Sequence, residues 1–171
     1  MESLQSELKF LKSVLLRLES PIVFCHNDLL LKNIIVNFYE NKVTFIDFEY
    51  SDYNYQAFDI ANYFCEFCGV DSFDASLYPS KEFQMKWIQN YLQMFSLLNK
   101  KENPMNMEQN FDNFYEIVNK FSLAAHFYWA LWALVQLTHS SINFDYAQFA
   151  MKRLEEYFRR KSIIFGDKIK Q

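Results

Sequence analysis

Glycine is almost absent from this sequence, because only Gly69 and Gly166 occur among its 171 residues. Phosphate-binding loops of the G-x-G-x-x-G and G-x-x-x-x-G-K types need closely spaced glycines, since the backbone must approach the phosphate group. The sequence contains neither of these motifs. Any nucleotide that the protein binds must therefore be held by other residues.

Cysteine, positive charge and long apolar runs are also scarce. The three cysteines, Cys25, Cys65 and Cys68, predict free thiols in a reducing, cytoplasmic compartment. The formal net charge is −4 and no basic stripe is present, so nucleic acid is not an expected partner. The longest apolar run, which follows Ala124, is interrupted at Gln136, before it reaches the roughly 18 residues that a membrane span needs.

Apolar residues are nevertheless abundant, at 51% of the chain, and aromatic residues make up 19%. This composition excludes a disordered protein. A chain of 171 residues is long enough for one domain and too short for two full-sized domains. We therefore expect a single domain over residues 1–171.

The spacing of apolar residues predicts five helices and a few short strands. Residues 22–25 are expected to form a short buried strand, and residues 34–36 and 43–46 a hairpin. The expected fold class is α+β, mainly α, with the hairpin surrounded by helices. The predicted helices cover residues 4–18, 56–68, 81–98, 107–138 and 144–161, with a break at 100–106.

One polar segment has the spacing of a kinase catalytic loop. Residues 26–33 (HNDLLLKN) fit H-x-D-x-x-x-x-N, in which the Asp takes the proton of the acceptor hydroxyl and the Asn holds a metal ion. The strand predicted at 43–46 leads into Asp47, where protein kinases have the metal-binding Asp of Asp-Phe-Gly. Asp28 is therefore the candidate catalytic base. Asn33 and Asp47 are candidate ligands of Mg²⁺, with ATP as the phosphoryl donor.

A second group of residues predicts a pocket for an organic cation. Trp129 and Trp132 lie one helical turn apart, and indole faces attract ammonium groups. Asp59, Asn62 and Glu66 share one face of another predicted helix, and the Glu66 carboxylate would add negative charge. No Ala-Pro-Glu segment follows, so the expected acceptor is a small molecule. Core packing of the two indoles remains an alternative.

Three segments resemble the carboxyl-terminal lobe of the choline/ethanolamine kinase family: residues 24–33 (FCHNDLLLKN), 45–66 (FIDFEYSDYNYQAFDIANYFCE) and 121–136 (FSLAAHFYWALWALVQ). Within the family, the chain looks more like ethanolamine kinases than choline kinases. The resemblance implies a protein-kinase-like fold and the ATP- and Mg²⁺-dependent phosphorylation of ethanolamine, with choline as a second substrate, toward phosphatidylethanolamine. The family's amino-terminal lobe is expected to be absent from this chain, which predicts little activity in isolation.

The resemblance also implies roles for individual residues. Asp28 matches the family's catalytic base, and Asn33 and Asp47 match its Mg²⁺ and phosphate site. His26 and Asp59 are implied to brace the catalytic loop by hydrogen bonds. A homodimer is left open. Residues around the substrate cation are matched by Glu66, Trp129, Trp132, Tyr50, Ile142, Phe144 and Tyr146.

Three other interpretations stay open. A lobe that binds an amine or a partner chain without transferring phosphate would have the same sequence features. A phosphotransferase for aminoglycoside-like substrates shares the loop motif, although it would need a broad acidic pocket in place of paired indoles. Cys65 and Cys68 could bind zinc together with Cys25 and His26, although the two cysteines fall inside an apolar helix.

Two sets of residues are expected to have structural roles only. His126 is predicted to be a hydrogen-bonded histidine packed between helices. The basic residues 159–161 are predicted to form the solvated end of the last helix, where positive charge suits the helix dipole.

Overall fold

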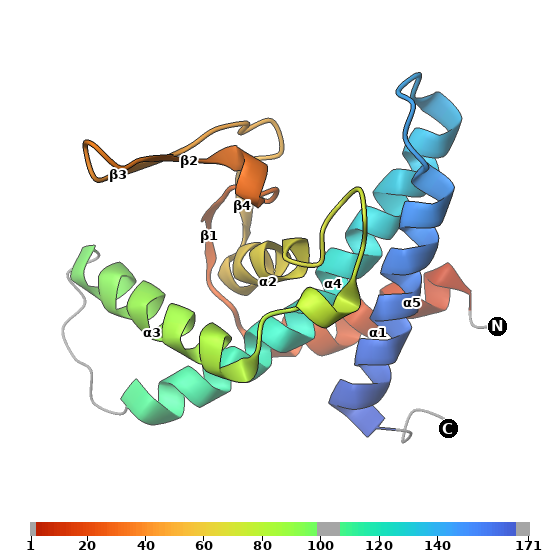
Figure 1. Cartoon of the computed structure of the whole chain (residues 1–171). Coiled ribbons are helices and arrows are strands. Elements are labelled where there is room, and N and C mark those ends of the chain that lie inside the picture. The colour runs from red at the N-terminus through yellow and green to blue at the C-terminus, as the bar shows by residue number, and fades with distance from the viewer. Residues whose placement is uncertain (1–2, 99–106, 167–171) are drawn as a thin grey trace.

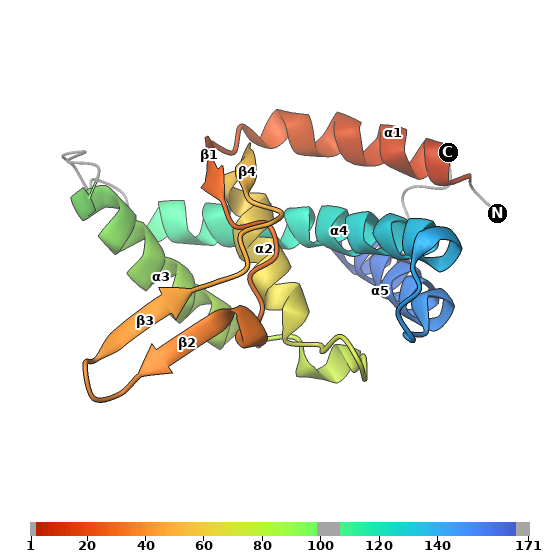
Figure 2. The ribbon, with the colours of Figure 1, turned by 90° about the horizontal axis from the view of Figure 1, so that it is seen from above.

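The computed structural model describes residues 3–98 and 107–166, which form five α-helices and two small antiparallel sheets (Figures 1 and 2). The expectation that helices surround the hairpin is wrong, because the hairpin of β2 and β3 projects from the helices. The prediction of an α+β, mainly α fold is confirmed; the predicted break at 100–106 lies outside the described residues. The elements are α1 (Leu4–Leu15), β1 (Ile22–Cys25), β2 (Ile34–Asn37), β3 (Lys42–Phe45), β4 (Asp52–Tyr55), α2 (Gln56–Glu66), α3 (Lys81–Leu98), α4 (Met107–His139) and α5 (Tyr146–Phe165).

The hairpin predicted around residues 34–46 is present as strands β2 and β3, in which Ile34 pairs with Phe45. The other sheet pairs β1 with β4, a strand that the sequence analysis missed. The prediction that β1 is buried is wrong for two of its residues, since Ile22 and Phe24 are exposed. The reason is that β1 has one partner strand, and one face of this two-stranded sheet is left uncovered by the described residues.

The hydrophobic core lies where α2, α4 and α5 pack together. Figure 1 shows α4 running across the molecule, with α5 beside its carboxyl-terminal half and α2 against its middle. Small side chains such as Ala57, Ala61 and Ala125 are fully buried and allow the helices to approach closely. Phe64, Phe121 and other large apolar side chains fill the remaining volume.

The start of α2 is fixed by residues that precede β1. The first N–H groups of a helix lack partners within it, and the residue before α2 offers no side-chain cap. Instead, the carbonyl oxygen of Pro21 accepts from the backbone N–H of Gln56 at 2.8 Å, and the Ser20 hydroxyl accepts from that of Ala57 at 3.1 Å. The segment before β1 is thereby attached to α2.

Charged residues of α5 are buried, contrary to prediction. Lys161 donates to both carboxylate oxygens of Glu7 on α1, at 2.8 and 2.9 Å, and Tyr157 donates to the same carboxylate. Arg160 is also buried. The expected solvated helix end is therefore wrong for Arg160 and Lys161. Their partners, such as Glu7, are remote in the sequence, so local charge patterning could not reveal them.

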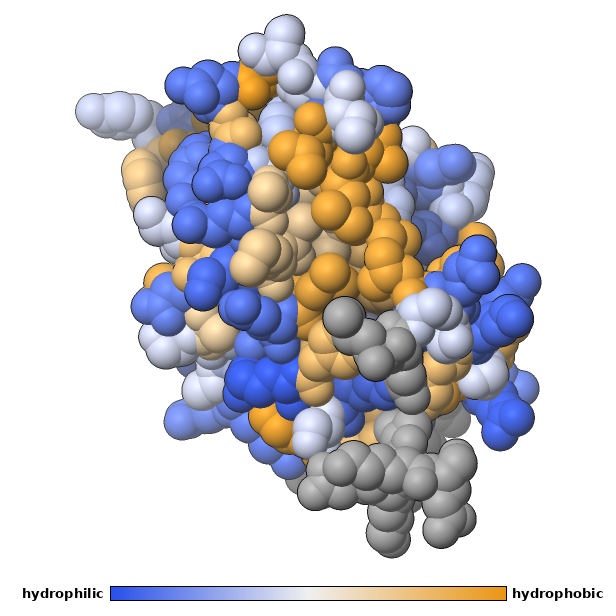
Figure 3. All heavy atoms as spheres, turned by 90° about the vertical axis from the view of Figure 1, so that its right-hand side faces the viewer, coloured by the Kyte–Doolittle hydropathy of each residue, from blue (hydrophilic) through white to orange (hydrophobic). Residues whose placement is uncertain are grey.

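Apolar surface is exposed at several places. Both strands of the hairpin expose apolar side chains, including Ile35 and Val43, and Leu8 of α1 is also exposed. Figure 3 shows a stripe of apolar side chains on the side of the molecule that faces right in Figure 1. Within the described ranges, none of the helices has the length and hydropathy needed to cross a membrane.

Candidate active site

The loop after β1 is attached to α2 and to the end of β3. The Asp59 carboxylate on α2 accepts from the backbone N–H groups of His26, at 3.1 Å, and Asn27, at 2.7 Å. The ring Nε2 of His26 lies 2.9 Å from the carbonyl oxygen of Ile46, directly before Asp47. The two motifs found in the sequence therefore meet through hydrogen bonds made by these residues.

Asp28, Asn33 and Asp47 lie on the same side of the molecule. The Asn33 amide donates to the carbonyl oxygen of Asp28 at 3.0 Å, and the Asn33 carbonyl oxygen accepts from the backbone N–H of Ile46 at 3.1 Å. Burial first, and then the charges of Glu66, Asp47 and Glu49, raise the pKa of Asp28 from 3.8 to about 7, although the Arg153 charge acts in the opposite direction. Asp28 is therefore poised to exchange a proton near neutral pH.

Asn33 and Asp47 offer oxygen atoms to a ligand. Among the described residues, neither the Asn33 Oδ1 atom nor the Asp47 carboxylate accepts a hydrogen bond. Asp47 has a positive φ of 64°, a left-handed conformation that is unusual for a residue other than glycine. Carboxylate and amide oxygens are donors that suit Mg²⁺. In the described part of the chain no three His, Cys, Asp or Glu side chains form a metal-binding group, so the zinc alternative is not supported.

A pocket of about 180 Å³ adjoins Asp28. It is smaller than the pockets that hold drug-sized ligands and suits a molecule of a few heavy atoms. Carboxylates and aromatic rings share its wall, which is the arrangement that organic cations favour. The lining residues are Asp28, Leu30, Glu49, Tyr50, Glu66, Val70, Trp129, Trp132, Phe149 and Arg153.

Hydrogen bonds hold the indole rings of this pocket in place. Trp129 donates through Nε1 to Oδ1 of Asn62 at 2.7 Å, and Trp132 donates through Nε1 to the hydroxyl of Tyr50 at 3.0 Å. The two indole rings meet edge to face, with centroids 5.3 Å apart. Asn62 also donates to the carbonyl oxygen of Asn27 at 3.1 Å, which connects Trp129 to the loop of residues 26–33.

One face of α2 therefore reaches three parts of the site. Asp59 binds the backbone of the loop, and Asn62 connects the loop to an indole. Glu66 lines the pocket and accepts from Nη2 of Arg153 at 2.5 Å. The sequence predicts the shared face of these three residues but not the partners of Asn62 and Glu66.

Three residues predicted to surround the substrate do not line the pocket. Tyr146 and Phe144 pack behind it, since the Tyr146 ring contacts that of Trp132, with centroids 5.7 Å apart, and Phe144 contacts Tyr146. Ile142 is 70% exposed and lies outside this wall. Tyr50 does line the pocket, as do Glu66, Trp129 and Trp132.

The sequence analysis missed five lining residues, of which Arg153 matters most for the charge of the pocket. Phe149 and Arg153 lie four positions apart on α5 and so share a helical face. The sequence could have indicated Arg153, because it lies on the same helical face as apolar residues that were expected to be buried. A buried guanidinium needs an acidic partner, which would have suggested a nearby carboxylate. The missed residues are Leu30, Glu49, Val70, Phe149 and Arg153.

Comparisons with known proteins identify the family of this chain. The family model described as choline/ethanolamine kinase matches residues 1–158. Human ethanolamine kinase 2 is 49% identical over 160 residues, which cover 94% of this chain and 40% of the relative. The chain thus spans about 40% of the length of this curated relative.

Two solved structures have the same fold over most of the chain. The ethanolamine kinase of Plasmodium vivax superposes with a TM-score of 0.78 and 36% identity, covering 90% of this chain and 38% of the other. The choline kinase of Cryptosporidium parvum gives a TM-score of 0.77 at 28% identity, covering 98% and 50%. The described fold therefore corresponds to one part of these larger kinases.

Proposed function

Because this chain belongs to the choline/ethanolamine kinase family, we propose that it is the part of an ethanolamine kinase that seats the amino alcohol and its catalytic base. The observation that carries the proposal is a single pocket lined by Asp28, Glu66, Trp129 and Trp132. It combines a proton acceptor, a counter-charge and two aromatic faces. The proposed reaction is the ATP-dependent phosphorylation of ethanolamine, with choline as a second substrate.

Each chemical step has a residue in this proposal. The ammonium group of the substrate lies against Glu66 and the two indoles. Asp28 orients the substrate hydroxyl and accepts its proton as the hydroxyl oxygen bonds to the γ-phosphorus. The bond from that phosphorus to the β,γ-bridging oxygen breaks, and ADP leaves. Positioning and charge stabilisation supply most of the rate enhancement in such transfers.

Asn33 and Asp47 would hold Mg²⁺, as their unoccupied oxygen atoms suggest. When bound, the ion neutralises charge that develops on the transferred phosphoryl group. The hydrogen bond from Asn33 to the loop carbonyl at Asp28 keeps the amide beside the catalytic base.

A cytoplasmic location is part of the same proposal. Cys25, Cys65 and Cys68 are buried free thiols, which suits a reducing compartment. The single domain and the homodimer remain predictions.

A non-catalytic amine-binding lobe is the second candidate. Asp47, the proposed metal ligand, is exposed and directly follows a hairpin whose strands both expose apolar side chains. Nothing in the described residues supports that side of the site as α2 and α4 support the amine pocket.

Calorimetry and an ATP-consumption assay separate these candidates. Titration with ethanolamine and with choline, each with and without MgATP, measures binding, and the assay measures transfer. Transfer that Asp28→Ala abolishes supports the kinase. Amine binding without transfer supports the second candidate, and the absence of amine binding contradicts both.

A further inference from the structure

The wall of the amine pocket contains a buried positive charge, that of Arg153 on α5. Its side chain is 1% exposed, and its Nη2 lies 2.5 Å from Oε1 of Glu66. By charge alone, a guanidinium beside a pocket weakens the binding of a cation there. Its place in a pocket proposed for an ammonium group therefore requires an explanation.

Aromatic rings hold the Arg153 guanidinium on two sides. Its Cζ atom lies 4.9 Å from the ring centroid of Phe149 and 5.5 Å from that of Phe73. Contacts with ring faces restrict a guanidinium to a few orientations. The group that binds Glu66 is thus itself fixed by its surroundings.

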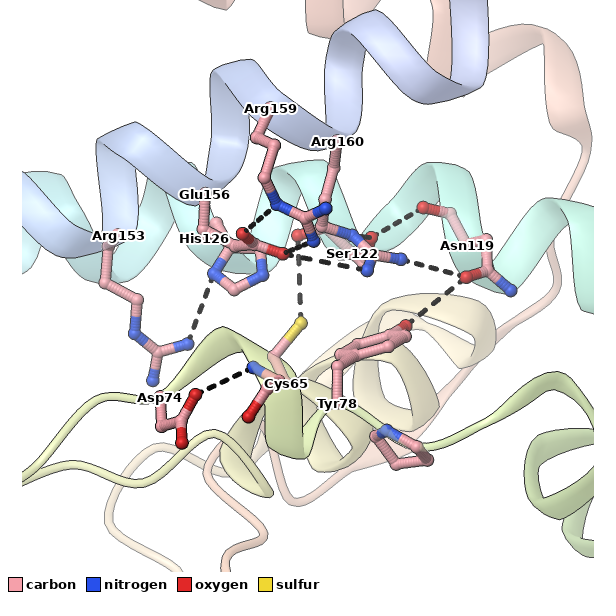
Figure 4. A network of polar contacts seen from close by, with 12 residues as sticks. Cys65, Asp74, Tyr78, Asn119, Ser122, His126, Arg153, Glu156, Arg159 and Arg160 are labelled. Carbon is pink, nitrogen blue, oxygen red and sulfur yellow. Dashed lines mark hydrogen bonds and ion pairs between the residues drawn. The ribbon is translucent and has the colours of Figure 1, made fainter.

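His126 on α4 supports Arg153 from a third direction (Figure 4). Nη1 of Arg153 lies 3.5 Å from Nδ1 of His126, which is fully buried. Burial, and then the nearby arginine charges with Arg153 first, hold the pKa of His126 well below its usual value. The neutral ring can accept from Arg153, whereas none of the residues that the structure describes forms a hydrogen bond with its Nε2. The prediction of a hydrogen-bonded histidine therefore holds for Nδ1 of His126 but not for Nε2.

We propose that Arg153 is a positioning residue for the amine, which it serves by fixing the Glu66 carboxylate. The guanidinium binds Oε1 of Glu66, so that the other carboxylate oxygen, Oε2, can accept from the ammonium group of the substrate. Among the described residues none donates a hydrogen bond to Oε2. The inference rests on the proposed function and adds to it a residue that acts through Glu66.

Positioning and simple electrostatics predict opposite results for Arg153→Met. If the guanidinium acted through its charge alone, removing it would strengthen the binding of ethanolamine. If it positions Glu66, the substitution weakens binding, because the carboxylate loses its fixed orientation in the pocket. The direction of the change therefore discriminates between the two roles.

The test is the calorimetric Kd of ethanolamine for the whole chain and three variants. Arg160→Met is the matched control, because Arg160 is also buried on α5 and stacks on the Tyr78 ring, at 3.8 Å, but does not line the pocket. We expect Arg153→Met to weaken binding about tenfold or more, Arg153→Lys about threefold and Arg160→Met less than about twofold. Both Met variants should lower the Tm.

A double substitution keeps the test valid if Arg153→Met alone does not fold. Glu66→Gln combined with Arg153→Met leaves no lone buried charge, and it should bind ethanolamine as weakly as Glu66→Gln alone, whereas charge alone predicts that the double variant binds more tightly. Tighter or unchanged binding by Arg153→Met, or a loss equal to that of Arg160→Met, overturns the positioning role. If the unsubstituted chain binds no ethanolamine, the proposed function itself fails, and this inference with it.

Discussion

The two halves of the candidate site are built in different ways. The amine half is made mainly by α2, α4 and α5, and most of the side chains that these helices supply are buried, with hydrogen bonds such as that between Trp129 and Asn62. The phosphate half depends on the β2–β3 hairpin, whose strands expose apolar side chains on both sides. Asp47 at the end of that hairpin is exposed and has a left-handed backbone conformation.

This difference indicates which half is organised in advance. A pocket whose polar groups already have partners loses little freedom when a ligand binds. The amine half meets that description through contacts among the described residues. The phosphate half has an anchored loop but an uncovered hairpin, so binding of a nucleotide should depend more on ordering that accompanies binding.

The largest expected effect lies at the boundary between the halves. Asp28→Ala should reduce ethanolamine turnover by about 10²–10⁴-fold, because the transition state loses its proton acceptor. An ATP-consumption assay measures it. Asp112→Ala is the control, since Asp112 is an exposed carboxylate on α4. Equal turnover in the two variants would refute the role of Asp28.

Removing one indole should damage the amine half selectively. Trp129→Ala loses the Asn62 hydrogen bond and a buried ring, and should lower stability by about 3–5 kcal/mol. Ethanolamine affinity should fall about tenfold, with a smaller change in ATP affinity. Trp87→Ala is the matched control, because Trp87 stacks on Tyr91 of α3 and does not line the pocket. Calorimetry that finds equal losses of amine and ATP affinity would contradict the selective damage.

A pair of identical substitutions compares the packing of the two regions. Ile88 on α3 is fully buried, whereas Ile35 on β2 is 50% exposed. Ile88→Ala should cost about 2–5 kcal/mol in the free energy of unfolding, and Ile35→Ala less than about 1 kcal/mol. Urea unfolding measures both. Equal costs would mean that the hairpin is packed as well as the helical core.

The smallest expected effect concerns pH. The pKa of Asp28 is raised from 3.8 to about 7, so the folded protein keeps a proton that the unfolded chain releases near pH 4. The folded state therefore loses stability relative to the unfolded state as the pH rises from about 4 to about 7. Above pH 7 this loss is complete and does not grow further. Asp28→Asn removes this cost and should raise the Tm by a few °C more at pH 8 than at pH 5.

Local patterns predicted most of the elements but few of the partners. Periodic apolar residues indicated the five α-helices of the described part, but not the short 3-10 helices at Leu31–Asn33 and Ala75–Leu77, and the loop motif indicated Asp28 and Asn33 as candidates. Strand β4 was missed because it has only four residues, and two of them, Asp52 and Asn54, are poor strand formers; its pairing with β1 was not visible in the sequence. Arg153 was missed because Glu66 lies 87 positions away in the sequence. Periodicity reports which face of an element is buried, not what faces it.

The most direct test of the amine pocket is an NMR measurement of contacts between bound ethanolamine and the three tryptophans. We expect nuclear Overhauser effects from the ethanolamine methylene protons to the indole protons of Trp129 and Trp132, and none to those of Trp87. Contacts only at Trp87, or no contact with Trp129 and Trp132 when ethanolamine is bound, would contradict the account.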